Sequence, residues 1–176
     1  MEKKKVLGIS GSLSLKSANA TVLKLIQQQL GEEFEFSIYN GIGHLPHFNP
    51  EIDIQPADKE VQRFRDELKE SAAVIICTPE YAFGVPGSLK NALDWTVSSG
   101  ELVNKPAALI TASLSGEKAQ AALLQTFTAL SLDIKPERTL LLSYIRSKLD
   151  DTGAFKNSID NDALKKVIES LKNCLS

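Results

Sequence analysis

Short, uninterrupted apolar runs recur along the chain and constrain its fold more than any other feature. Four such runs lie at residues 6–9, 74–77, 107–111 and 140–142. Runs of this length without polar alternation are typical of strands in a parallel sheet that helices cover on both faces. Residues 34–38, Phe-Glu-Phe-Ser-Ile, alternate instead. This alternation predicts a fifth strand at an edge of the sheet, where one face is only partly covered.

Helical periodicity separates these runs. Apolar side chains recur every three or four residues over three segments, 22–30, 61–68 and 164–175. Two shorter helices are predicted over 87–97 and 117–130. Pro56 and Pro86 lie where the first turn of a helix accepts proline. Strands and helices therefore alternate along the whole chain.

Five strands alternating with five helices predict a doubly wound α/β fold. Right-handed crossovers leave few topologies, and the flavodoxin-like parallel order 2-1-3-4-5, with helices on both faces, places the alternating strand at an edge. In this order the chain reverses direction across the sheet between strands 1 and 3, and ligands bind beyond the carboxyl ends of those strands. We therefore expect the loops after Ile9 and Cys77 to carry the chemistry, within a single domain over residues 1–176.

The loop after the first predicted strand is rich in small polar side chains. Residues 10–19 are Ser-Gly-Ser-Leu-Ser-Leu-Lys-Ser-Ala-Asn, and a predicted helix follows them. The free N–H groups and partial positive charge of a helix N-terminus attract anions, and Ser12, Ser14, Ser17 and Asn19 can donate hydrogen bonds to phosphate oxygens. The loop contains neither a Walker A signature nor G-x-G-x-x-G. Taken alone, it leaves two hypotheses open: a phosphate site, or a helix cap at Ser17 or Asn19.

The loop after the third strand combines stiffness with flat apolar side chains. Residues 78–95 are Thr-Pro-Glu-Tyr-Ala-Phe-Gly-Val-Pro-Gly-Ser-Leu-Lys-Asn-Ala-Leu-Asp-Trp. Prolines, glycines and aromatics directly after a buried strand offer backbone donors and acceptors beside apolar surface. A flavin ring needs this combination, because its pyrimidine edge is polar and its faces are apolar.

Together the two loops resemble the NADPH-dependent FMN reductases, a family of flavin, quinone, chromate and azo-dye reductases with a flavodoxin-like fold. The resemblance rests on Gly-Ser-Leu-x-x-x-Ser-x-Asn after strand 1 and on Thr-Pro-Glu-Tyr-x-x-x-x-Pro-Gly-x-Leu-Lys-Asn-Ala-x-Asp-Trp after strand 3. In element order it covers residues 5–145. The second motif is long and specific, and both motifs fall where the topology places the binding crevice.

The resemblance implies an FMN site built from three loops. The implied contacts are Ser12, Ser14, Ser17 and Asn19 at the phosphate, Pro79, Glu80, Tyr81, Ala82 and Phe83 beside the isoalloxazine ring, and Ser113, Ser115 and Gly116 against its other side. The chain departs from the family at two of these positions and in the third loop, where Gly116-Glu117-Lys118 provides less glycine than the family usually has. Ser14 stands where the family usually has Arg, so a charge-assisted phosphate contact is lost, and Lys16 is a candidate substitute. Ala82 stands where Asn or His is common.

The implied activity is that of a reductase. NADPH or NADH would reduce bound FMN, leave, and be replaced at the same open face by a small oxidant such as a quinone, a free flavin, an azo compound or chromate. No catalytic side chain is expected, because the flavin carries the chemistry. Glu80 is therefore not expected to act as a general acid. The helix with Lys90 and Asp94 would lie at a subunit interface, which implies a homodimer or a tetramer. Two alternatives stay open: a flavodoxin-type FMN electron carrier without nicotinamide turnover, and a flavin-free binding module on the same fold.

Composition bounds the partners and the location. A net charge of −2 and a pI near 5.8 provide no broad basic field for nucleic acid or an acidic membrane. The apolar stretch near the N-terminus is too short for a signal peptide or a membrane span. Cys77 and Cys174 form no CxxC pattern, which favours a reducing cytoplasm and no disulfide. For His44 and His47 we expect a loop that folds over the active site rather than a metal site.

Overall fold

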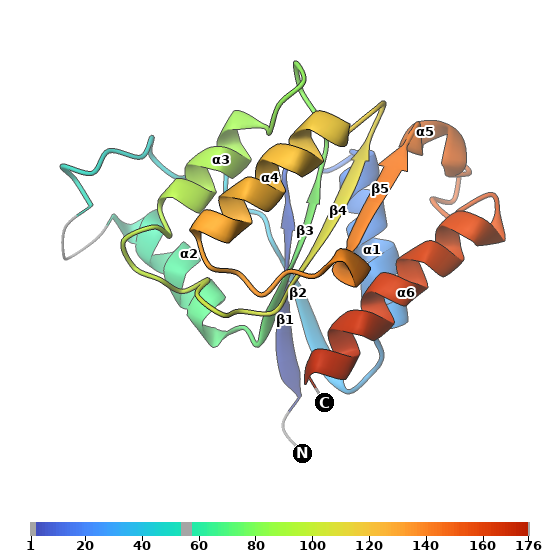
Figure 1. The fold of residues 1–176 in the computed structure, drawn as a ribbon, viewed down its shortest axis with the longest axis horizontal. Coiled ribbons are helices and arrows are strands. Elements are labelled where there is room, and N and C mark those ends of the chain that lie inside the picture. The colour runs from blue at the N-terminus through green and yellow to red at the C-terminus, as the bar shows by residue number, and fades with distance from the viewer. Residues whose placement is uncertain (1–2, 54–57, 176) are drawn as a thin grey trace.

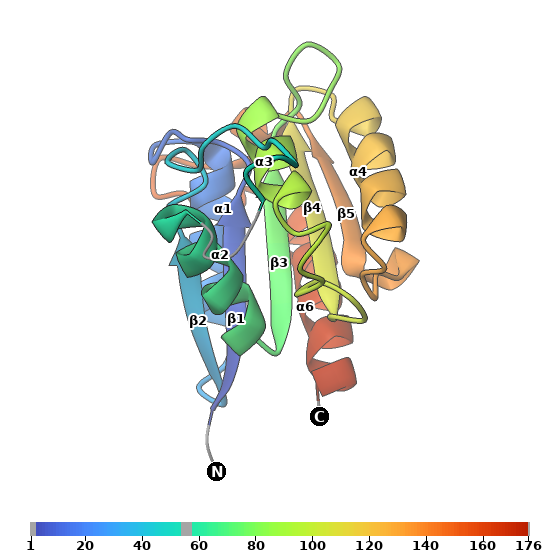
Figure 2. The same cartoon turned by 90° about the vertical axis from the view of Figure 1, so that its left-hand side faces the viewer.

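The computed structural model describes residues 3–53 and 58–175, and Pro56 lies outside the described residues. Five parallel strands form one sheet in the order β2-β1-β3-β4-β5. The strands are β1 (Lys4–Ser10), β2 (Phe34–Tyr39), β3 (Ala73–Thr78), β4 (Ala107–Ser113) and β5 (Thr139–Ser143). The predicted flavodoxin-like order is confirmed, and the alternating segment 34–38 is the edge strand β2 (Figure 2).

Helices cover both faces of the sheet (Figures 1 and 2). One face carries α1 (Ala18–Leu30) and α6 (Ser158–Leu175), and the other carries α2 (Lys59–Glu70), α3 (Gly87–Asp94) and α4 (Glu117–Ala129). A short α5 (Ile145–Lys148) follows β5, and a 3₁₀ turn, η1 (Pro136–Arg138), precedes β5. Neither was predicted, because three or four residues carry no readable periodicity. In the described part of the chain, no helix combines the length and the apolar character that crossing a membrane requires.

Helix α3 ends at Asp94, three residues before its predicted end at 97. The carbonyl of Trp95 accepts hydrogen bonds from Arg65, at 3.0 Å from Nε and 2.6 Å from Nη2. Arg65 is buried and comes from α2, so a side chain from another helix satisfies a carbonyl that the next helical turn would otherwise use. This tertiary contact could not be inferred from the local sequence.

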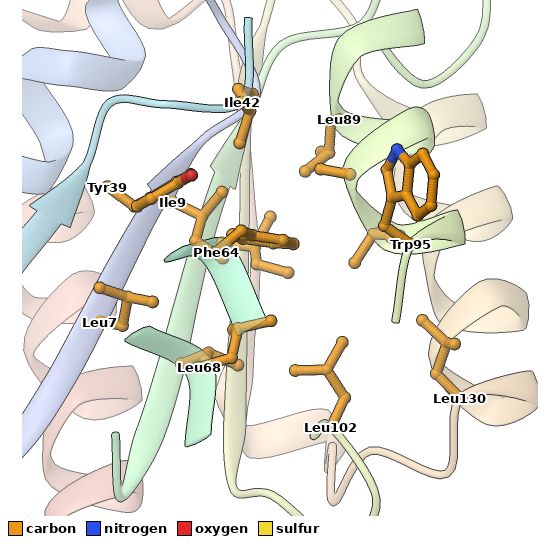
Figure 3. Packing of buried hydrophobic residues seen from close by; sticks show 14 of the residues in the cluster. Leu7, Ile9, Tyr39, Ile42, Phe64, Leu68, Leu89, Trp95, Leu102 and Leu130 are labelled. Atoms are coloured by element: carbon orange, nitrogen blue, oxygen red, sulfur yellow. The ribbon is translucent and has the colours of Figure 1, made fainter. Parts of the chain in front are cut away.

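Side chains of each central strand alternate between two cores, one on each face of the sheet. On β3, Val74 and Ile76 enter the core beneath α2, α3 and α4, which Figure 3 shows around Phe64. Ala73, Ile75 and Cys77 enter the core beneath α1 and α6. Burial on both faces explains why the sequence of this strand is uninterrupted and apolar.

Gly11 fixes the loop after β1 against the end of β3. Its N–H donates to the Cys77 carbonyl at 2.8 Å. A Cβ at this position would lie 2.2 Å from Oγ1 of Thr78, a side chain that is itself buried. The two loops at the switch point therefore approach as closely as a glycine allows.

We predict that Gly11→Ala lowers the free energy of unfolding by about 1–3 kcal/mol, the usual cost of overpacking a dense site. Chemical denaturation measures the loss. Gly87→Ala is the matched control, because a Cβ at Gly87 would meet no atom within 4 Å. Equal stability of the two variants would contradict the close approach of the loops.

Candidate functional site

A cavity of about 430 Å³ opens at the carboxyl ends of β1, β3, β4 and β5. Its size is that of a small-molecule or cofactor site. Residues at or after the ends of four strands line it: Ser12, Ser17, Ala18 and Asn19 after β1, Pro79, Glu80 and Tyr81 after β3, Ala112, Ser113 and Leu114 at the end of β4, and Tyr144, Ile145, Arg146 and Ser147 after β5. Other hollows on the described part of the chain lie along the surfaces of α2 and α6 and between β2, residues 40–44 and α2. The convergence of several loops occurs at the predicted switch point.

The N-terminus of α1 supplies free hydrogen-bond donors to this cavity. Ser17 is the N-cap, and its hydroxyl accepts from the Ala20 N–H at 3.1 Å. The N–H groups of Ala18 and Asn19 have no acceptor among the described residues. Two free N–H groups at a helix start, beside the hydroxyls of Ser12 and Ser17, form a favourable environment for an anion. Capping and anion binding are thus compatible here, because different groups serve each.

The Asn19 side chain is buried and ties α1 to two strands. Its Nδ2 donates to the Ala112 carbonyl at 3.2 Å, and its Oδ1 lies 3.3 Å from Sγ of Cys77, which donates to it. Burial raises the pKa of the Cys77 thiol, so this cysteine stays protonated and serves as a core residue. The contribution of Asn19 to a ligand would therefore come chiefly from its backbone N–H.

Ser12 connects the first loop to the loop after β3. Its hydroxyl lies 3.4 Å from the hydroxyl of Tyr81 and accepts a hydrogen bond from the Ser14 N–H at 3.3 Å. Ser14 itself is exposed, and its carbonyl accepts from the Ser17 N–H. Ser14 thus shapes the turn that presents Ser12 and Ser17 to the cavity.

A tight turn projects from the loop after β3. Tyr81 and Gly84 pair through two backbone hydrogen bonds of 3.0 and 2.9 Å, and the residues between them, Ala82 and Phe83, have φ of 49° and 59°. Positive φ at both central positions is the geometry of a type I′ turn, for which Asn-Gly is the preferred sequence. This explains why Asn suits position 82, and it means that Ala82 and Phe83 hold a strained backbone. Phe83 is 81% exposed at the tip.

Glu80 joins the loop after β3 to the start of α4. Its carboxylate accepts from Oγ of Ser115 at 2.7 Å and from the Ala119 N–H at 2.9 Å, and its own N–H donates to Oγ of Ser113 at 3.0 Å. Helix α4 begins after Gly116, which has no side chain to cap it. Glu80 therefore caps α4 from a different loop.

These donors determine the charge of Glu80. The hydrogen bond from Ser115 lowers the pKa of the Glu80 carboxyl, burial opposes this, and the N–H groups of residues 116, 118 and 119 lower the pKa further. The pKa lies below its ordinary value of 4.5, so the group is ionised at neutral pH. An ionised carboxylate that is held by several donors is suited to positioning the loop and not to donating a proton.

The loops after β4 and β5 are also joined. The Tyr144 N–H donates to the Leu114 carbonyl at 3.0 Å, and Oγ of Ser143 donates to the Ser115 carbonyl at 2.8 Å. The lining residues 144–147 were not predicted. No motif marks them, although their place directly after a strand that ends at the same edge of the sheet is a signal that could have found them.

The structure brings together part of the predicted site. Seven predicted residues line the cavity: Ser12, Ser17, Asn19, Pro79, Glu80, Tyr81 and Ser113. Five do not line it: Ser14, Ala82, Phe83, Ser115 and Gly116. The role of each in binding a cofactor stays a prediction.

The loop with His44 and His47 differs from its expected position. No described residue of 40–53 lines the cavity. The loop is held against α3 instead, because the Pro46 carbonyl accepts from Nδ2 of Asn91 at 2.9 Å and from Nε1 of Trp95 at 2.8 Å. Trp95 is buried and is a packing residue. Among the described residues, no group of three or more His, Cys, Asp or Glu could hold a metal ion.

The turn predicts a stabilising change. Replacing Ala82→Asn and Phe83→Gly together should raise the free energy of unfolding by about 1 kcal/mol. The left-handed backbone costs about 1–2 kcal/mol per ordinary residue, and the greater conformational entropy of glycine in the unfolded chain offsets part of the gain from removing this strain. Urea denaturation measures the gain. Phe83→Ala is the control, because alanine keeps the strain. A double variant no more stable than this control would show that the turn is unstrained.

The cap predicts a pH-dependent loss. At pH 7, Glu80→Gln should lower the free energy of unfolding by about 1 kcal/mol, the typical contribution of a helix cap. The pKa of Glu80 is lower in the folded protein, so its contribution is complete above its ordinary value of 4.5 and disappears as the pH falls through the folded value. Wild type and variant should therefore converge in acid in denaturation curves. Glu117→Gln, in the first turn of α4 but without these contacts, is the control, and parallel curves at all pH values would rule out the cap.

Known proteins resemble this chain over nearly its whole length. An NAD(P)H-dependent FMN reductase of Pseudomonas aeruginosa is 29% identical over 178 residues, covering 96% of this chain and 93% of that protein. An NADPH:quinone oxidoreductase of Arabidopsis thaliana is 31% identical, covering 96% and 90%. Among solved structures, FerB from Paracoccus denitrificans, a flavoenzyme NAD(P)H:(acceptor) oxidoreductase, matches with a TM-score of 0.78 at 27% identity, covering 97% of this chain and 96% of FerB.

The family itself is shown by a match to more than half of the chain. The sequence model of the NADPH-dependent FMN reductases matches residues 4–144, a range that contains both loop motifs and all five strands. This chain belongs to the NADPH-dependent FMN reductase family and is an oxidoreductase that uses FMN and NAD(P)H.

Proposed function

We propose that this chain passes electrons from NADPH or NADH, through FMN held in the cavity at the carboxyl edge of the sheet, to a small oxidant such as a quinone or a free flavin. The observation that carries the proposal is the convergence of the free N–H groups of α1 with the loops after β3 and β4 on one cavity. The names of the relatives from Arabidopsis thaliana and Pseudomonas aeruginosa support the quinone and flavin acceptors. Azo compounds and chromate are further candidates.

The described residues fit FMN at both of its ends. The free N–H groups of Ala18 and Asn19 and the hydroxyls of Ser12 and Ser17 suit a phosphate. Leu114 and Tyr81 are 73% and 56% exposed, and offer apolar surface to a flat ring. When bound, FMN supplies the redox chemistry, accepting hydride from the reduced nicotinamide and passing electrons to the acceptor.

In the proposed site the protein binds and positions. Pro79, Glu80, Tyr81 and Ala82 would hold one edge of the ring, and Ser113 would contact it from the end of β4. Phe83, Ser14, Ser115 and Gly116 support these contacts from neighbouring positions. Glu80 keeps the two ring-binding loops at a fixed separation through its hydrogen bonds to Ser115 and α4. No side chain is assigned as a catalytic acid or base.

We also propose a cytoplasmic homodimer, built from one domain over residues 1–176. Large apolar side chains lie exposed on the loops at the carboxyl edge of the sheet: Leu13, Tyr81, Phe83, Leu114 and Tyr144. Such clustering favours a partner surface. Lys90 and Asp94, which form an ion pair of 2.6 Å on α3, lie on the helix proposed for the interface. Both cysteines are free, which suits a reducing compartment.

Anaerobic spectroscopy tests the proposed activity. Purified protein with FMN should show a flavin absorbance band that NADPH or NADH bleaches and that a quinone restores, with steady turnover when both substrates are present. Bound flavin that neither nucleotide bleaches would indicate a flavodoxin-type electron carrier. Protein that binds no FMN would indicate a flavin-free module. A control without protein corrects for direct reaction between nucleotide and quinone.

A further inference from the structure

Arg146 is a cation at the cavity that has no hydrogen-bond or ion-pair partner among the described residues. It lines the cavity together with Ser12, Ser17, Ala18 and Asn19. No hydrogen bond or ion pair engages its guanidinium among the described residues. Nearby, Lys148 is held by Asp160 at 2.6 Å. Of the lysines and arginines in the described part of the chain, Arg146 alone lines the cavity, so its charge is available to a ligand.

The backbone that carries Arg146 is anchored on both sides. Before it, Ile145 is buried and the Tyr144 N–H is held by the Leu114 carbonyl at 3.0 Å. After it, Gly153 lies so close to α1 that a Cβ there would be 2.8 Å from Cγ2 of Thr21. The connection from β5 to α6 therefore runs beside the first turn of α1. The backbone at Arg146 is therefore held in place beside α1, and its exposed side chain is left to meet a ligand.

The charge balance at the start of α1 calls for a cation. The first loop presents serine hydroxyls and N–H groups, but Ser14 is uncharged, and Lys16, which is exposed like Arg146, does not line the cavity. A phosphate carries up to two negative charges, and a planar guanidinium can bind two of its oxygens in parallel. Arg146 is far from position 14 in the sequence, but it lines the same cavity as the first loop and can supply the missing positive charge.

We propose that Arg146 binds the phosphate of FMN from the β5 side of the cavity and replaces the cation that position 14 lacks. The inference rests on the proposed FMN site and assigns a specific ligand group to a residue outside both sequence motifs. Under this assignment, Arg146 determines that the site binds phosphorylated flavin more tightly than unphosphorylated flavin. The phosphate of NADPH is the competing source of the same chemistry, and the test separates the two.

Flavin fluorescence quenching tests the assignment, with Kd measured for FMN and for riboflavin, which lacks the phosphate. Arg146→Ala should raise the Kd for FMN about tenfold or more, as expected for the loss of a charge-assisted hydrogen bond, and leave the Kd for riboflavin unchanged. The dependence of FMN affinity on salt should also weaken. Ser14→Arg, added to Arg146→Ala, should restore part of the FMN affinity. Arg63→Ala, which removes an equal charge on α2, is the matched control.

Several outcomes would overturn the assignment. Wild-type protein that binds FMN, with an unchanged Kd in Arg146→Ala, would reject Arg146 and leave the proposed function intact. Equal losses for FMN and riboflavin would indicate a general change in the cavity. A rise in KM for NADPH in Arg146→Ala, with FMN affinity unchanged, would assign Arg146 to the nucleotide. A large loss of FMN affinity in Lys16→Ala, with none in Arg146→Ala, would assign the phosphate to Lys16. Wild-type protein that binds neither flavin would reject the proposed function together with this inference.

Discussion

The close approach of the first loop to the end of β3 is the constraint on which the site depends. The Gly11 N–H donates to the Cys77 carbonyl, and the absent side chain of Gly11 leaves the space that Thr78 occupies. Strands β1 and β3 are neighbours in the sheet although β2 lies between them in sequence. Their loops therefore diverge from a common point, and the start of α1 faces the crevice between them.

The same polar side chains hold the fold and frame the cavity. Asn19 ties α1 to β3 and β4, and Glu80 caps α4 while it fixes the loop after β3. Buried polar groups and helix ends must be satisfied, and here the loops satisfy each other. At the cavity, two sets of donors have no acceptor among the described residues: the N–H groups at the start of α1 and the guanidinium of Arg146. All of these free groups are donors, and together they suit an anion.

Three of the five non-glycine residues with positive φ in the described part of the chain lie at the carboxyl edge of the sheet. Ala82, Phe83 and Tyr144 have positive φ without being glycine, and all three lie in loops after strands that end at the site. Such conformations persist only where the surroundings enforce them, and they are common at functional sites. Phe83 and Tyr144 are also exposed, so they add little to the core of this chain. Their positions favour contacts with a ligand or a second subunit.

The uninterrupted apolar runs and their alternation with helices determined the strand order, the edge position of β2 and the switch point, because burial on both faces leaves a direct trace in sequence. The two motifs likewise indicated Ser12, Ser17 and Tyr81. The sequence could not show that the Asn19 side chain would bond to Cys77 and Ala112, that Glu80 would cap α4, or that Arg146 would line the same cavity as the start of α1. Those relations join residues far apart in the chain, and only the packing of the strands and helices brings them within hydrogen-bonding distance or around one cavity. Local pattern thus determined the framework and its active edge, whereas the partners of each polar group were decided by the tertiary structure.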